Sequence, residues 1–144
     1  PMSLTILDKG ADVTDICSNV DFASMASPGS WVVNPDWAAA NADVIVRFNR
    51  AMFKAMDFAA AATTDDAVAE EVAGYVSAIT GLDVESTIAQ RYDGSWLTSA
   101  QVLEMIDSGK LVEYYNAQQT NFGDAAGPLK ADEFVLVDLM INAK

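Results

Sequence analysis

The chain has 144 residues, 51% of them hydrophobic, which suits one globular domain with a core of moderate size. Its 21 acidic and eight basic residues give a net charge of −13, and such a surface repels phosphate backbones, so nucleic-acid binding is not expected. A single cysteine and the absence of histidine exclude an intrachain disulfide, cysteine-based metal clusters and Ser-His or Cys-His nucleophile pairs.

The chain divides into an irregular start and a longer helical part. Residues 1–30 show no sustained period and are predicted to be irregular and hinge-like, whereas residues 31–144 are predicted to be mainly helical. Residues 31–33 are β-prone, so a short strand is expected there. Asn34 then suits the cap of a helix and Pro35 suits its first position.

Residues 42–61 carry the most regular helical period. Apolar side chains recur along one face at steps of about four residues: Val44, Phe48, Met52, Met56 and Ala59. Basic side chains fall on the opposite face, at Arg47, Arg50 and Lys54. They are interpreted as a solvent-exposed face rather than a surface that binds an acidic partner. The pattern predicts one long amphipathic helix.

Shorter helices are predicted after it. Residues 63–66 supply a cap and first-turn acids for an apolar stripe that ends at Gly81. Asp83 caps a short helix, and Thr98 with Gln101 three residues later resembles a capping box.

The end of the chain is more ambiguous. Tyr114 and Tyr115 lie in another helical piece, and residues 131–142 are compatible with strand or helix. Residues 131–133 resemble a first helical turn, which favours helix. The predicted fold class is therefore predominantly α, with at most a few short strands near the N-terminus.

From residue 31 onward the order of elements resembles the nitrate/sulfonate/taurine-type solute-binding proteins of ABC importers. The residues that carry the resemblance are the β-prone run followed by Asn34-Pro35-Asp36-Trp37 and the helix to Phe48, then Thr80-Gly81-Leu82-Asp83, and finally Asp132-Glu133-Phe134-Val135 ahead of Asp138. The likeness covers roughly residues 20–142, although no single motif in it is diagnostic of the family.

The resemblance implies a periplasmic-binding-protein-like α/β fold of two lobes with a ligand between them. Intact members are about twice as long as this chain, so the chain would be the C-terminal, mostly helical portion of such a protein. It implies capture of a small anionic or zwitterionic solute, such as a sulfonate, taurine or nitrate, and its delivery to an ABC permease. The location implied is periplasmic or extracytoplasmic, with neither catalysis nor a cofactor.

The best candidate for ligand contact is the segment that ends in Trp31. Ser27, Gly29 and Ser30 are small or hydroxyl residues that leave backbone N–H groups open to an anion. Trp31 can pack against an apolar part of the ligand. The alternative is a hinge turn with Trp31 in the core. Trp96 could line the mouth of the cleft, or it could close a junction between helices.

The remaining clusters point to structure rather than chemistry. Asp65, Asp66, Glu70 and Glu71 lie at one helix start and are interpreted as a solvated turn, because no second facing cluster suggests metal binding. No catalytic residues and no metal site are predicted.

Two further expectations concern the state of the chain. It holds no run of 18 apolar residues and no leader, although an exported protein without its N-terminal part would give the same sequence. Without the other lobe the apolar stripes lack a partner, so a homo-oligomer is expected. The alternative function is a self-contained acidic helical module whose apolar face binds a partner helix or a second copy of the chain.

Overall fold

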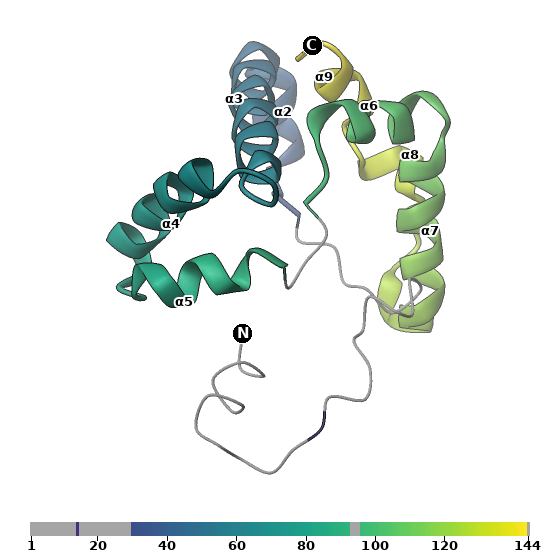
Figure 1. Cartoon of the computed structure of the whole chain (residues 1–144). Coiled ribbons are helices and arrows are strands. Elements are labelled where there is room, and N and C mark those ends of the chain that lie inside the picture. The colour runs from purple at the N-terminus through teal and green to yellow at the C-terminus, as the bar shows by residue number, and fades with distance from the viewer. Residues whose placement is uncertain (1–13, 15–29, 93–95, 144) are drawn as a thin grey trace. The chain divides into compact units, whose positions relative to one another are not determined.

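The computed structural model describes residues 14, 30–92 and 96–143, and all regular secondary structure in this part of the chain is helical (Figure 1). The predicted predominantly α class is confirmed. The strand predicted at residues 31–33 is wrong, because these residues have no regular structure and Val32 is 92% exposed. A β-prone run forms a strand only where another strand pairs with it, and the described residues provide none. Apart from Thr14 and Ser30, the predicted irregular start lies outside the described residues.

The chain forms two compact units, which are described separately. One unit holds the described residues of Pro1–Val32 together with Val112–Val135, and the other consists of Val33–Leu111 with Leu136–Lys144.

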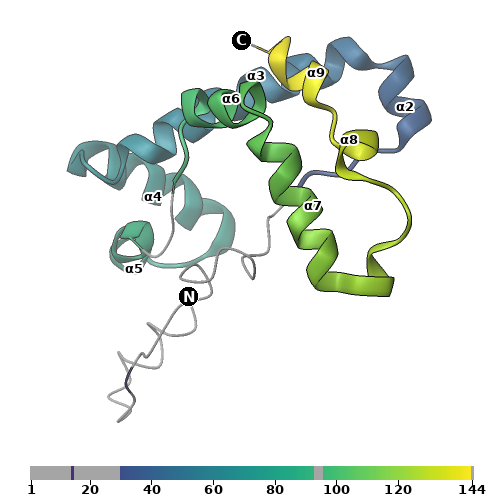
Figure 2. The same ribbon diagram turned by 90° about the vertical axis from the view of Figure 1, so that its right-hand side faces the viewer.

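The larger unit contains most of the helices. They are α2 (Pro35–Ala40), α3 (Ala42–Ala61), α4 (Asp66–Thr80), α5 (Val84–Ala89), the 3-10 turn η2 (Gln90–Tyr92), α6 (Ser99–Asp107) and α9 (Val137–Ile141). The long helix α3 packs against α4, α6 and α9, and α4 packs against α5 (Figure 2). The predicted helix at residues 42–61 is confirmed with these bounds.

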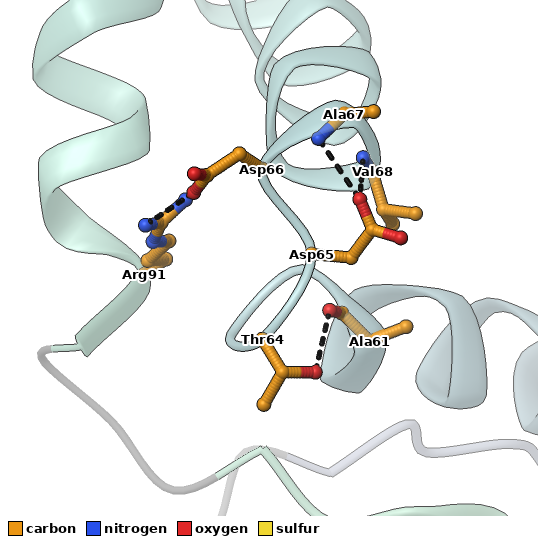
Figure 3. A network of polar contacts seen from close by, with 7 residues as sticks. All are labelled: Ala61, Thr64, Asp65, Asp66, Ala67, Val68 and Arg91. Atoms are coloured by element: carbon orange, nitrogen blue, oxygen red, sulfur yellow. Dashed lines mark hydrogen bonds and ion pairs between the residues drawn. The ribbon is translucent and has the colours of Figure 1, made fainter.

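Local capping explains where these helices begin and end. The Asn34 side chain accepts the backbone N–H of Trp37 at 3.1 Å, and Pro35 opens α2. Asp65 caps α4 by accepting the N–H groups of Ala67 and Val68 at 3.0 and 3.3 Å (Figure 3). The helix stops at Gly81 in a left-handed conformation. The caps predicted at Asn34, within residues 63–66 and at the capping box of Thr98 are all present, the second of them at Asp65.

The core of this unit lies where α3, α6 and α9 meet. Phe53, Val102, Ile106 and Ala143 are buried there, with partly buried side chains such as Val46 packed around them. Elsewhere among the described residues of the chain, the buried apolar positions are all alanines: Ala38, Ala62, Ala69, Ala73 and Ala131. The larger unit therefore has few large buried side chains to hold it together.

The packed face of α3 is rotated from the predicted one. Phe53 is only 7% exposed, whereas Val44 and Phe48, two residues of the predicted stripe, are 36% and 41% exposed. Alanines and apolar side chains cover more than half of the circumference of α3, so its period alone does not specify which side faces the neighbouring helices.

The smaller unit is built on α7 (Lys110–Phe122), which enters it at Val112, followed by η3 (Gly123–Ala126) and α8 (Ala131–Phe134). A side chain of α7 fixes the start of α8, because Asn116 Oδ1 accepts the N–H of Ala131 at 3.0 Å.

The single helix predicted at residues 131–142 is wrong. Val135 adopts an extended backbone, with φ −83° and ψ 114°, and ends α8 before α9 begins at Val137. The β-branched side chain of Val135 favours this extended geometry. No described helix is long and apolar enough to span a bilayer.

Candidate functional site

The predicted ligand-contacting residues fall in different parts of the structure. Ser27 and Gly29 lie outside the described residues. Ser30 and Trp31 belong to the smaller unit, and Trp96 belongs to the larger one. Ser30 and Trp31 are consecutive residues of one unit, and Trp96 belongs to the other unit.

Ser30 is joined to the middle of α7. Its hydroxyl shares a hydrogen bond of 2.8 Å with the hydroxyl of Tyr115, 85 residues later in the chain. The Tyr115 ring makes edge-to-face contacts with Tyr114 and Phe134, at centroid separations of 5.9 and 6.1 Å. A pair of hydroxyls thus lies at the side of an aromatic cluster.

Trp31 follows this hydroxyl pair directly, and its side chain is 77% exposed. It is therefore not part of a core formed by the described residues, which was the structural alternative for this position. Ser30 and Trp31 together offer hydrogen-bonding capacity and an exposed apolar ring at consecutive positions, and Tyr115 adds a second hydroxyl from α7.

Tyr115 is the site residue that sequence reasoning missed. Periodicity identified Tyr114 and Tyr115 only as apolar positions of a helical piece. Two consecutive aromatic residues on a helix point in directions about 100° apart, so the sequence does not reveal which one turns toward Ser30.

Trp96 has a structural role in the larger unit. Its indole N–H donates to the backbone carbonyl of Arg91 at 2.7 Å, which closes the connection between η2 and α6. The side chain is 48% exposed. This geometry matches the helix-junction alternative.

The acidic cluster of α4 has structural partners. Asp65 caps the helix, and Asp66 forms an ion pair of 2.8 Å with Arg91, whose guanidinium pKa it raises (Figure 3). Glu71 accepts the hydroxyl of Tyr75 at 3.0 Å. No group of three or more histidine, cysteine or acidic residues in the described part of the chain could hold a metal ion. These carboxylates serve the helix start and its packing.

Comparison with protein-family models, with curated proteins and with solved structures finds no match to the chain. The family assignment therefore rests on the sequence resemblance alone.

Proposed function

We propose that the chain is part of an extracytoplasmic solute-binding protein of an ABC importer, of the nitrate/sulfonate/taurine type. In this proposal it binds a small anionic or zwitterionic solute and presents it to a permease, and it performs no reaction. The sequence resemblance supplies the family, and the segment around Trp31 supplies the site.

The observation that carries the proposal is the hydroxyl pair of Ser30 and Tyr115 beside the exposed Trp31. Hydroxyl groups can donate to the oxygens of a sulfonate or carboxylate, and the indole can cover the short carbon chain of the solute. Ser30 and Trp31 belong to the segment whose small, hydroxyl and aromatic residues suggested ligand contact, and Tyr115 joins them from α7.

The groups at this site support binding rather than catalysis. The chain contains no histidine, so the Ser30 hydroxyl cannot be activated by the most common general base. Ser30 instead pairs with the phenol of Tyr115, and a neutral phenol is a weak general base.

The test is calorimetry combined with NMR, using taurine, ethanesulfonate and nitrate as solutes. Because the other lobe of the proposed cleft is not in this chain, we expect binding to be weak or undetectable by calorimetry. At millimolar solute, we expect shifts at the Trp31 indole and Tyr115 in the wild type and smaller shifts in Tyr115→Phe. The Trp37 indole, also exposed, is the control signal.

Two results would contradict this proposal. Micromolar or tighter binding by this chain would show that it forms a complete site, so it would not be one part of a two-lobe cleft. Equal shifts at Trp31 and Trp37, unchanged by Tyr115→Phe, would show that the Ser30 and Tyr115 pair is not the site.

A second candidate function is an acidic helical interaction module. A specific observation favours it: large apolar side chains are exposed at the end of α4 and the start of α5, with Ile79 87% exposed. Exposed apolar side chains gathered in one place mark protein contacts more often than isolated ones do. Binding of helical peptides to the wild type, compared with a variant in which Ile79 and Leu82 are replaced by serine, tests that function.

A further inference from the structure

The junction of α4 and α5 carries a cluster of exposed apolar side chains, called here the α4–α5 apolar surface. It consists of Tyr75, Ile79, Leu82 and Val84, which are 60%, 87%, 46% and 40% exposed. All four lie within ten residues of one another in the larger unit. Figures 1 and 2 both show α4 and α5 lying beside each other at this junction.

The turn between α4 and α5 fixes the backbone that carries these side chains. Tyr75 and Ile79 are one helical turn apart, so their side chains are neighbours on α4. Gly81, with φ 74°, reverses the chain, and the N–H of Leu82 donates to the Thr80 hydroxyl at 3.3 Å. Asp83 then caps α5 by accepting the N–H of Ser86 at 2.8 Å. The backbone of this surface is therefore already ordered, and binding a partner would cost little conformational entropy there.

Several carboxylates lie close in sequence to the apolar side chains. Glu71 accepts the Tyr75 hydroxyl at 3.0 Å, and Asp83 and Glu85 flank Val84. Residues 65–92 contain six acidic residues and one basic residue, Arg91, which already pairs with Asp66. The α4–α5 apolar surface thus belongs to a strongly acidic part of the chain.

We propose that the α4–α5 apolar surface binds a basic amphipathic helix of another protein. The apolar face of such a helix would cover Ile79 and Leu82, and its lysine or arginine side chains would lie against Glu71 and Glu85. A helix is the natural partner because the surface is a pair of helices joined by a turn, and it offers side chains rather than a strand edge.

Charge argues against occupants from this chain or from a second copy. The acidic residues of this part of one copy would meet the same residues on the other, and like charges brought together in an interface cost free energy. The chain outside residues 65–92 holds 15 of the 21 acidic residues and seven of the eight basic ones, so it is also acidic. Residues 1–29 follow this trend, with four aspartates and one lysine.

The probe is a synthetic 14-residue helical peptide of leucine and lysine, with a leucine and glutamate peptide of the same pattern as its control. We expect the lysine peptide to bind the full chain and the glutamate peptide not to bind, by fluorescence anisotropy. The affinity should fall steeply between low and high salt, because exposed charge pairs are screened.

Variants locate the binding. Ile79→Ser with Leu82→Ser should weaken the lysine peptide at least about tenfold, because it removes both apolar anchors. Val32→Ser is the matched control, since Val32 is 92% exposed and lies in the other unit, and it should change the affinity less than about twofold. Glu71→Gln with Glu85→Gln should weaken binding and reduce its salt dependence. Circular dichroism checks that each variant keeps its helical content.

Three outcomes would overturn this proposal. Equal binding of the lysine and glutamate peptides would show that charge does not select the partner. An unchanged affinity in the Ile79 and Leu82 variant would place the peptide elsewhere on the acidic chain. A wild-type oligomer that dissociates only in that variant would show by light scattering that a second copy occupies the surface. The proposal does not depend on solute binding.

Discussion

Asp57 shows how one carboxylate can fix the start of a helix that is distant in sequence. Near the C-terminal end of α3, it accepts the backbone N–H and the hydroxyl of Ser99, both at 2.7 Å. Ser99 is the first residue of α6, so Asp57 supplements the cap that Thr98 provides. The position of α6 against α3 therefore depends partly on this one side chain.

Replacing Asp57 by alanine should lower the free energy of unfolding by about 1–2 kcal/mol, because two donors at the start of α6 lose a charged acceptor. The matched control is Asp43→Ala on the same helix. Asp43 forms an exposed ion pair with Arg47 at 3.2 Å, so its loss should cost at most about 0.5 kcal/mol. Urea unfolding compares the two, and equal effects would argue against the capping role of Asp57.

Asp83 makes stability depend on acid pH. Hydrogen bonds from the hydroxyl and the backbone N–H of Ser86 hold the pKa of the Asp83 carboxyl below its ordinary value of 3.8. Since the folded pKa is the lower one, the stabilising contribution is present above pH 3.8 and is lost as pH falls through the folded pKa.

We expect an NMR titration of the Asp83 carboxyl to give a midpoint below 3.8. Asp83→Asn keeps an oxygen that can accept the Ser86 N–H, so this variant should lose less stability than the wild type between pH 7 and pH 3. A midpoint at or above 3.8 would contradict the cap geometry.

At the scale of elements, α4 contains two glycines with opposite roles. Gly81 ends the helix with φ 74°, whereas Gly74 lies inside it with no atom within 4 Å of the position that a Cβ would take. A left-handed backbone is strained for a residue with a side chain, but a glycine inside a helix costs backbone entropy.

Gly81→Ala should therefore lower the free energy of unfolding by about 1 kcal/mol, and Gly74→Ala should raise it by about 0.5–1 kcal/mol. Thermal unfolding of the two variants measures both signs. A stabilising Gly81→Ala would show that α4 does not end in a left-handed turn.

For the whole molecule, the prediction of self-association remains. Val44 and Phe48 on α3 are exposed, while Met52, Val68, Val72 and Val76 are half-buried within their own unit. Helix α3 carries both signs of charge, two acidic and three basic residues, so two copies could meet along it with less repulsion than at the uniformly acidic α4–α5 apolar surface.

We expect a dimer or a larger symmetric assembly, with an interface of at least roughly 1,000 Å², by light scattering at micromolar concentration. Val44→Asp should weaken the assembly, because it places a charge in the apolar contact. A stable, well-folded wild-type monomer would instead favour the self-contained interaction module over the proposed solute-binding protein.

Most helix boundaries could be predicted because they are local. The caps at Asn34, Asp65 and Thr98 and the stop at Gly81 depend on hydrogen bonds and backbone conformations within a few residues. The period of residues 42–61 predicts α3 for the same reason, since neighbouring turns of a helix are only three or four residues apart.

The packing and the candidate site needed the tertiary structure, because they depend on contacts between residues far apart in sequence. Which side of α3 faces the core is decided by α6 and α9, not by the wide apolar surface of the helix. Asp57 meets Ser99 across 42 residues, and Ser30 meets Tyr115 across 85. The sequence by itself determined where helices form, because helix formation depends on residues that are near in the chain. Only the tertiary structure decided which side chains share a site.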